Sequence, residues 1–525
     1  MQVAEVVVKI LESEGIESAF GIPGAAINPV YEYLGTSKQI KHYLARHEEG
    51  AAHAADGYYR ACGRMALAIC TSGPAATNFV TGLYTAQVDS IPLIAITGQN
   101  VRAQLGKESF QCVDIAAIAK PVCKGTWCIT EPSQIPSIMR EAFRVAKEGR
   151  PGPVLIDLPL DVQMADIPYS PETDSPLPIK KTEPDRRKIA RAVEMLLAAE
   201  KPVLIMGGGV LLAHATERFI EFAEYLALPV ITTYMATGGI PADHPLHVGH
   251  IGIQVGSPFG NKFFLDSDVV LGIGRTVSTE LGIVADAGLA LNALVAEAKA
   301  RTPRREQSAR VKNIPHDRAQ LARKTRYDET PIKPQRVYYE MNEYFGADTI
   351  YTTGCGLNQI WSGQFQQIAK PYTYLASGGA GTLGYDLPAA IGAKIAKPDA
   401  TVVAVMGDGG FGFMMEELAM ACQHKIPIIV VIVNNGYLSL IRQNQRYAYE
   451  YEYAVNLHYD GGGIDFVKLA ESFGAYGERV TKPNDIRSAF ERAVKCGKPA
   501  VLDIIVERET DCSMGGSLDA VREFV

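Results

Sequence analysis

Hydrophobic residues along the chain form short apolar runs that alternate with longer amphipathic stretches. The runs VVAVM (402–406) and IPIIVVIV (426–433) have the length of strands, and Gly, Asp, Asn or Pro bounds each of them. Unbroken apolar runs of this kind are typical of strands buried on both faces of a parallel sheet, and the stretches between them are typical of crossover helices. The pattern predicts an α/β protein made of Rossmann-like, doubly wound parallel sheets.

Three such units are expected along the chain. Residues 1–168 and 335–525 alternate strand and helix, and a third unit at 182–325 carries the short strands PVLIMGGG, PVITTY and VVLGIG with helices such as ERFIEFAEYLA. The polar, proline-rich segment SPETDSPLPIKKTEPDRR marks the first join, and a second lies near NIPHDRAQLARKTRYDETPIKP. A length of 525 residues has room for about three domains of ordinary size.

One spacing in the middle unit conflicts with this pattern. The segments VVLGIGR and LGIVADA read as consecutive parallel strands, yet only TVSTE separates them. A parallel crossover needs a dozen or more residues. Either the protein lacks a βα unit at this point, or it has further residues between Arg275 and Leu281 that this sequence omits. We favour the second interpretation.

Composition and charge exclude several classes of function. A formal net charge of −7 and a pI near 5.9, without a Lys/Arg cluster, argue against a nucleic-acid partner. No apolar run approaches the ~20 residues that span a bilayer, and MQVAEVVVKILESEGI is charged and amphipathic, unlike a signal sequence, so we expect no membrane partner and a cytoplasmic location. The nine cysteines form no CxxC pair, which favours free thiols over disulfides or zinc.

The most informative motif lies between the runs 402–406 and 426–433. The first ends in Gly407-Asp408-Gly409-Gly410, and the second ends in Asn434-Asn435. A helical crossover between two parallel strands places both ends beside one crevice. Asp and Asn supply the hard oxygen ligands that Mg²⁺ prefers, and Gly lets a diphosphate approach the backbone closely. A Gly-rich turn with an unrelated Asn-Asn turn is the alternative.

At this point the chain resembles the thiamine diphosphate enzymes, whose fingerprint is GDG, a spacer of this length and NN. The resemblance implies that Asp408, Asn435 and the carbonyl of Tyr437 hold Mg²⁺. It also implies a pyrimidine-binding domain at 1–168, a central FAD-type domain at 182–325 and a diphosphate-binding domain at 335–525. Further positions that the resemblance assigns to the cofactor are Pro23, Thr71, Pro74, Asn78, Leu357, Asn358, Gly381, Leu383, Gly407, Gly409 and Gly410.

Glu48, in LARHEEGAAHAADGYYRACG, matches the glutamate that activates the cofactor in most of these enzymes. Such a carboxylic acid bonds to the aminopyrimidine nitrogen and promotes loss of the proton at C2 of the thiazolium. The alternative is a solvated glutamate that caps its own helix, a role that suits Glu49 better. In this family the pyrimidine and diphosphate domains of one site come from different subunits, which implies a homodimer, often doubled to a homotetramer.

Longer stretches resemble the glyoxylate carboligases, also called tartronate-semialdehyde synthases, within the acetohydroxyacid synthase group. They include FGIPGAAINPVY, FQCVDIAAIAKPV, NNGYLSLIRQNQR and SMGGSLDAVREF. The resemblance implies condensation of two glyoxylates with loss of CO₂, and thus a small 2-oxo acid or aldehyde as substrate. Phe110 and Gln111 match the pair that faces the reacting carbon, and Leu440 lines the same pocket.

Departures from these families keep other substrates open. Glyoxylate carboligases have a valine where this chain has Glu48, and acetohydroxyacid synthases have a substrate-binding Lys and a Trp where it has Leu160 and Asn444. The alternatives are an acetolactate synthase-like or engineered enzyme acting on pyruvate or formaldehyde, a flavoenzyme resembling pyruvate oxidase, and a non-catalytic paralogue. The last would usually have lost Asp408, Asn435 or Glu48.

The resemblance also implies FAD in the middle domain, bound without redox use. The matching positions are Arg150, Gly207, Gly208, Gly209, Thr232, Met235 and Asp286. If the short spacing after Arg275 reflects a true deletion, the strand that grips the adenosine is lost with it.

Overall fold

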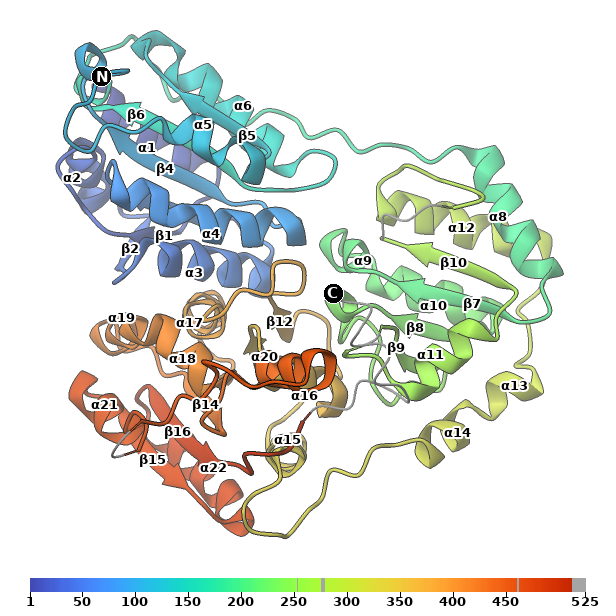
Figure 1. Ribbon diagram of the computed structural model, residues 1–525. Helices are drawn as coiled ribbons and strands as arrows, with labels where there is room; N and C mark the ends of the chain where they lie inside the picture. Colours follow the sequence, from blue (N-terminus) through green and yellow to red (C-terminus); the bar gives the residue numbers. More distant parts are fainter. Residues whose placement is uncertain (253, 275–278, 460–461, 512–525) are drawn as a thin grey trace.

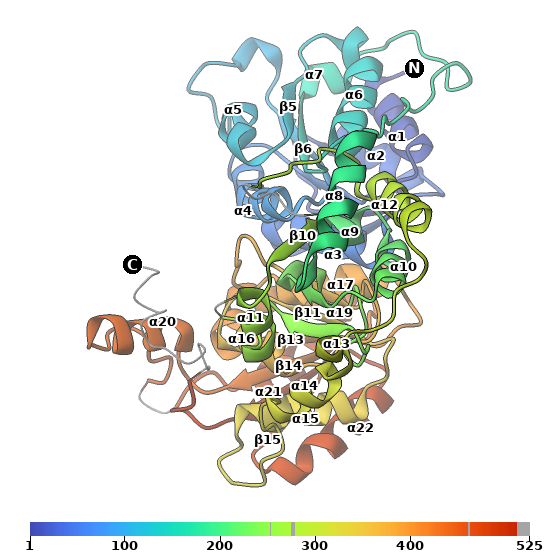
Figure 2. The same cartoon turned by 90° about the vertical axis from the view of Figure 1, so that its right-hand side faces the viewer.

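The computed structural model has three parallel sheets, each in its own segment of the chain (Figure 1). The structure describes residues 1–525 except 253, 275–278, 460–461 and 512–525. The three α/β units confirm the expected fold class. In Figure 2 the central unit faces the viewer, with the first unit above it and the third below.

The first sheet has six strands in the order β2-β1-β3-β4-β6-β5, all parallel. The strands are β1 (Ser18–Gly21), β2 (Lys41–Leu44), β3 (Leu67–Cys70), β4 (Ile94–Gln99), β5 (Gly125–Cys128) and β6 (Val154–Pro159). The helices are α1 (Val3–Ser13), α2 (Asn28–Thr36), α3 (Glu48–Cys62), α4 (Pro74–Asp89), α5 (Ile115–Ala119), α6 (Ile135–Lys147) and α7 (Leu160–Gln163). Strands β1, β3, β4 and β6 are buried throughout, as is typical of strands in a parallel sheet covered on both faces.

The central sheet has four parallel strands in the order β10-β7-β8-β9. The strands are β7 (Pro202–Met206), β8 (Val230–Thr232), β9 (His247–His250) and β10 (Val269–Ile273). The helices of this segment are α8 (Arg186–Ala198), α9 (Gly208–Leu212), α10 (Thr216–Leu226), α11 (Pro258–Leu265), α12 (Ala287–Arg301), α13 (Ala309–Lys312) and α14 (Ile314–Gln320).

The expected strand LGIVADA is wrong. Residues 281–286 contain no strand, and Asp286 is the N-cap of α12. Too few residues separate this segment from β10 for a parallel crossover. Instead, Leu281 and Ile283 pack against the core of the central domain, and Lys188 donates a 2.8 Å hydrogen bond to the carbonyl of Gly282. The step from Arg275 to Leu281 falls partly outside the described residues.

The third sheet has six parallel strands in the order β12-β11-β13-β14-β16-β15. The strands are β11 (Ile350–Thr353), β12 (Tyr374–Ala376), β13 (Val402–Gly407), β14 (Ile429–Asn434), β15 (Tyr476–Val480) and β16 (Ala500–Ile505). The helices are α15 (Pro334–Tyr344), α16 (Leu357–Phe365), α17 (Asp386–Ala396), α18 (Asp408–Met414), α19 (Leu418–Gln423), α20 (Ser439–Asn444), α21 (Phe466–Phe473) and α22 (Ile486–Lys495), with a 3-10 turn at Met415–Glu417 between α18 and α19.

Helices α3 and α17 join the first and third domains into one packed body. Small residues make the contact, as the Ala-rich sequence of α3 predicts. A Cβ on Gly392 would lie 1.9 Å from the carbonyl oxygen of Ala54, and one on Gly57 would lie 2.2 Å from that of Ala389. The two backbones therefore touch, and one hydrophobic core runs through both domains.

Candidate active site

The ends of β13 and β14 bring Asp408 and Asn435 together, as the sequence predicts. The two strands are adjacent, with Gly407 paired to Val433, and Asp408 begins α18 directly after β13. The Asp408 carboxylate accepts backbone N–H groups of Asn435 and Gly436. Its pKa is raised to about 7 because burial penalises the charged form. A buried acid of this kind is stabilised as an anion by a bound cation.

The side chain of Asn435 leaves one end of its amide free. Its Oδ1 accepts a 2.7 Å hydrogen bond from Ser439, whose hydroxyl also lies 3.1 Å from the carbonyl oxygen of Tyr437. Its Nδ2 is buried and finds no partner among the described residues. Such an orphaned polar group indicates that something else occupies this space in the working protein.

These groups fit a magnesium diphosphate. Asp408, the Asn435 amide and the Tyr437 carbonyl offer hard oxygen ligands around one turn. The described residues contain no group of three or more His, Cys, Asp or Glu side chains that could hold a metal, so a metal site in this part of the protein needs amide and backbone oxygens as well.

Asn358 reaches the same turn from the helix that follows the neighbouring strand β11. It lies in the first turn of α16, is 4 % exposed, and its Nδ2 donates to the carbonyl of Val405 at 3.2 Å. A Cβ on Gly407 would lie 3.3 Å from Asn358 Oδ1, so only a glycine leaves this approach fully open. Leu357 is buried in the core below.

The loop before α17 has the conformation that a close backbone contact requires. Gly381 and Gly384 have φ angles of 61° and 81°, and the half-buried Leu383 lies between them. Thr382 forms a 2.6 Å hydroxyl contact with Thr85 of α4. The Gly381–Leu383 loop is therefore attached to the first domain of the same chain.

Glu48 lies at the start of α3, in a buried position. It is 8 % exposed, and Asn78 of α4 donates a 2.9 Å hydrogen bond to its Oε2. The next residue, Glu49, instead contacts His53 at 3.4 Å within its own helix. The structure thus separates the two glutamates, with Glu48 held by a second helix and Glu49 in a local contact.

The predicted residues of the first domain surround the start of α4. Thr71 Oγ1 accepts a 3.2 Å hydrogen bond from the backbone N–H of Ala26, in the loop that also contains Pro23. Pro74 is the first residue of α4. Gln111 has a φ of 55° and packs against Gly73, where a Cβ would lie 2.7 Å from the Gln111 Cβ. Strain of this kind is common at functional sites.

Phe110 does not pack against these residues within the chain. Its side chain is 85 % exposed, while its carbonyl accepts a 2.8 Å hydrogen bond from Asn100.

On α20, Leu440 packs partly against the core of the third domain, and Asn444 is the last residue of the helix. Within the described part of the chain, no hydrogen bond or ion pair joins Glu48 to Asp408 or Asn435.

Glu417 is an important residue that the sequence analysis missed. It is fully buried in the third domain, and its Oε1 accepts the backbone N–H groups of Arg46 and His47 at 3.0 and 2.8 Å. Burial raises its pKa to about 7. The apolar neighbours in MMEELAMA were the available signal, because an acid inside such a stretch is seldom solvated.

The predicted flavin residues already have protein partners. Arg150 donates to Ser90 at 2.7 Å and to the carbonyl of Val88 at 2.9 Å. Asp286 caps α12 through the backbone of Leu289 at 2.9 Å. All three bonds are internal to the protein.

Other residues of the chain also contact the glycine turn after β7. A Cβ on Gly207 would lie 2.5 Å from the carbonyl oxygen of Gly274, and the N–H of Gly209 donates to that same oxygen at 3.2 Å. Thr232 hydrogen-bonds to His250 at 2.7 Å, and Met235 packs against Gly378 of the third domain. These contacts lie within the chain, and residues 275–278, which follow Gly274, lie outside the described residues.

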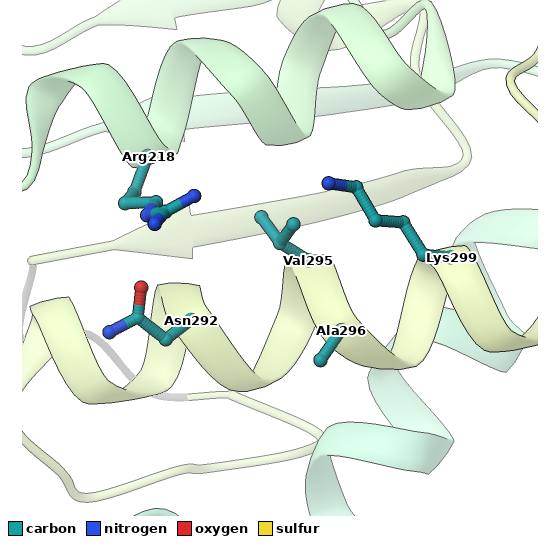
Figure 3. Close-up of a pocket in the computed structure, with 5 residues that line it drawn as sticks. All are labelled: Arg218, Asn292, Val295, Ala296 and Lys299. Atoms are coloured by element: carbon teal, nitrogen blue, oxygen red, sulfur yellow. The ribbon is translucent and has the colours of Figure 1, made fainter.

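A separate pocket of about 390 Å³ lies between α10 and α12 of the central domain. Figure 3 shows Arg218 on one helix opposite Asn292, Val295, Ala296 and Lys299 on the other. Arg218 and Lys299 both pair with Glu221, at 2.5 and 2.7 Å. Their charges are therefore satisfied within the protein, and none of the predicted site residues lines this pocket.

Comparison with known families agrees with the three-domain architecture. The N-terminal TPP binding domain of thiamine pyrophosphate enzymes matches residues 1–118, the central domain matches 189–283, and the C-terminal TPP binding domain matches 354–504.

Full-length relatives narrow the family further. Glyoxylate carboligase of Escherichia coli O157:H7 is 44 % identical over 573 aligned positions, which cover 100 % of this chain and 96 % of the relative. A probable acetolactate synthase large subunit of Methanococcus aeolicus is 36 % identical over 100 % of this chain and 96 % of that protein. The acetolactate synthase large subunit of Corynebacterium glutamicum is 40 % identical over 96 % of this chain and 86 % of its own length. The chain belongs to the thiamine diphosphate-dependent carboligases and decarboxylases, in the group that contains glyoxylate carboligase and acetolactate synthase.

Proposed function

We propose that this protein condenses two molecules of glyoxylate to tartronate semialdehyde and CO₂, taking up one proton, with thiamine diphosphate and Mg²⁺ as cofactors. The observation that carries the proposal is the convergence of Asp408 and Asn435 at two adjacent strand ends, in a chain 44 % identical over its whole length to a glyoxylate carboligase. The acetolactate synthase relatives, at 36 and 40 % identity, make pyruvate the main alternative substrate.

Bound thiamine diphosphate would supply a nucleophilic carbon that also accepts the electrons released by decarboxylation. The chain's own residues would bind and orient it. Asp408, Asn435 and the Tyr437 carbonyl hold Mg²⁺, while Asn358 and the turn at Gly407–Gly410 approach the diphosphate. Leu383, in the loop before α17, would pack against the cofactor.

Glu48 is the proposed proton-handling acid. Asn78 fixes Oε2 at 2.9 Å, which leaves Oε1 to hold a proton toward the ring nitrogen of the pyrimidine. Burial keeps bulk water from competing for that proton. Gln111 donates to the substrate carbonyl, Phe110 and Leu440 line the pocket, and Asn444 leaves room for the second aldehyde.

The smallest active unit in this proposal is a homodimer, which pairs to a homotetramer. Two facts support it: Glu48 has no bond to Asp408 or Asn435 among the described residues, and Phe110, next to Gln111, is 85 % exposed. A dimer whose two chains share each site would cover this side chain. Mixing Glu48→Gln and Asp408→Ala protomers tests it, because a site shared between two chains is rebuilt in a mixed dimer and activity returns.

Flavin takes no part in the proposed mechanism. The Gly207–Gly209 turn lies where a doubly wound sheet binds nucleotides. In this structure the turn contacts Gly274, whose carbonyl accepts the N–H of Gly209. The FAD expectation stays a prediction. The visible absorbance of the purified protein, before and after incubation with FAD, tests it.

No described helix is both long and apolar enough to cross a membrane. A cytoplasmic location remains a prediction, which cell fractionation tests.

The substrate is tested by supplying glyoxylate, pyruvate and formaldehyde separately to protein incubated with thiamine diphosphate, Mg²⁺ and FAD. CO₂ release and mass spectrometry identify the products, and the Asp408→Ala variant serves as control. Tartronate semialdehyde from glyoxylate supports the proposal. Acetolactate from pyruvate, or glycolaldehyde from formaldehyde, with no product from glyoxylate, contradicts it. Bleaching of flavin by substrate without oxygen would instead indicate an oxidase.

A further inference from the structure

The backbone just before Glu48 is held by a side chain from another domain. Glu417 lies at the end of the 3-10 turn that follows α18, and its Oε1 accepts the N–H groups of Arg46 and His47. These are the two residues that precede Glu48. A carboxylate at this end of α3 also interacts favourably with the helix dipole.

The sequence of α3 makes room for this contact. A Cβ on Gly50 would lie 2.4 Å from Glu417 Oε1, so any larger residue at position 50 would displace the carboxylate. Glu417 is fully buried, and water cannot replace its two bonds. The fit between Gly50 and Glu417 fixes how closely the start of α3 approaches the third domain.

Two further side chains from the end of α19 hold the same connection between β2 and α3. His424 Nε2 accepts the N–H of Leu44 at 3.0 Å, and Gln423 Oε1 accepts a 2.5 Å hydrogen bond from the guanidinium of Arg46. The segment that carries these contacts begins at Asp408. One short stretch of the third domain therefore bears the proposed metal ligand at its start and the contacts to the Glu48 loop at its end.

We propose that Glu417 is a positioning residue for Glu48, which sets the start of α3 so that the Glu48 carboxyl meets the pyrimidine ring. This inference rests on the proposed function of Glu48. Glu417 itself touches neither substrate nor cofactor in this assignment. A displacement of about 1 Å at a catalytic group can cost on the order of a hundredfold in rate, so loss of two backbone bonds next to Glu48 has a measurable effect.

The experiment compares Glu417→Ala with Glu417→Gln, which keeps an oxygen acceptor at the same distance. Gln423→Ala is the matched control, because Gln423 contacts only the Arg46 side chain of this loop. The first readout needs no cofactor: hydrogen exchange of the backbone amides at 44–50. We expect faster exchange in Glu417→Ala, and protection like the wild type in Glu417→Gln and Gln423→Ala.

The second readout is exchange of the cofactor C2 proton, followed by NMR in the loaded protein. We expect Glu417→Ala to slow it by about tenfold to a hundredfold, with thiamine diphosphate affinity changed by less than about threefold. If Glu417→Ala does not fold, Glu417→Asp replaces it, since its shorter side chain retracts the acceptor. Wild-type protection at 44–50, or wild-type C2 exchange, in the Ala or Asp variant overturns the inference. Failure of the wild type to bind thiamine diphosphate or exchange its C2 proton contradicts the proposed function instead.

Discussion

The hydroxyl of Tyr385 donates a 2.7 Å hydrogen bond to Asp56 across the crossing of α3 and α17. Both residues are buried, and Asp56 also binds Arg60, whose guanidinium reaches the carbonyl of Ala376 in the third domain at 2.9 Å. This polar contact lies beside the small apolar residues at which α3 crosses α17. It indicates that the joint is specified by geometry as well as by hydrophobic burial.

Replacing Tyr385 with Phe tests that joint. Asp56 keeps its bonds to Arg60, so we expect loss of one net hydrogen bond, about 1 kcal/mol of unfolding free energy. Chemical denaturation measures the change. Tyr453→Phe, at a position 78 % exposed, is the matched control and should leave the midpoint unaltered. Equal midpoints for all three proteins would contradict the role given to the bond.

Replacing Asp408 with Ala should abolish Mg²⁺-dependent binding of thiamine diphosphate. Removing an outer-shell partner of a metal typically costs about tenfold to a hundredfold in affinity, and loss of a direct ligand should exceed that. Titration calorimetry with and without Mg²⁺ measures it. Asp399→Ala, at an exposed position of the same domain, should bind like the wild type. Retained Mg²⁺-dependent binding in Asp408→Ala would place the metal elsewhere.

Glu48→Gln should leave cofactor binding largely intact and slow C2 proton exchange by about a hundredfold or more, because the amide holds no transferable proton. NMR of the loaded protein follows the exchange. Glu49→Gln is the control, since Glu49 contacts His53 in its own helix. Unchanged exchange in Glu48→Gln would show that another group activates the cofactor.

Asn444→Trp should hinder bulky acceptors more than glyoxylate, since a large side chain at the end of α20 narrows the acceptor pocket. We expect a loss of about tenfold or more in relative kcat/KM for a 2-oxo acid larger than glyoxylate. Competition between the two acceptors, read by mass spectrometry, measures the ratio. An equal loss with every acceptor would place Asn444 outside that pocket.

The stability of the first domain should depend on the protonation of Asp157. This residue is 1 % exposed, accepts hydrogen bonds from Thr97 and Gln99, and has its pKa raised by burial from 3.8 to about 7. The folded state therefore binds the proton more tightly than the unfolded state. The resulting stabilisation is complete below the unfolded pKa and is lost as the pH rises through about 7.

Asp157→Asn removes this titration. The melting temperature of the variant minus that of the wild type should increase as the pH rises from about 5.5 to about 8. These two pH values are chosen to bracket the folded pKa of about 7. Asp161→Asn, which alters a surface pair with Arg102, should show no such trend. Parallel stability curves for the wild type and Asp157→Asn would contradict the assignment.

Local pattern predicted much of the fold and the meeting of the two strand ends that carry Asp408 and Asn435. The apolar runs before Asp408 and Asn435 are strands, and parallel pairing does bring their ends together, because this follows from chain topology alone. The segment 281–286 misled the prediction, since an apolar run can pack as irregular chain when too few residues precede it for a crossover.

Contacts between distant segments could not be predicted from local pattern. Glu417 and Arg46 are far apart in the sequence, and the bond between them depends on how two domains dock. The contacts of Arg150 with Ser90 and Val88 are of the same kind, whereas Asp286 caps its own helix through the nearby Leu289. Each of these two residue types suits a ligand, and each is used by the protein itself. Residue identity at a matching position does not reveal whether the side chain is free.

The first and third sheets have the same strand order. In both, the helix after the second strand begins with an acid: Glu48 opens α3 after β2, and Asp386 opens α17 after β12. One architecture thus occurs twice in a single polypeptide, as a duplicated ancestral domain would leave it. In the proposed function the two copies differ in task, the first serving proton transfer through Glu48 and the second binding the diphosphate and its metal through Asp408. Because one hydrophobic core runs through both copies, mutations that change one task are tolerated only where they leave the crossing of α3 and α17 intact.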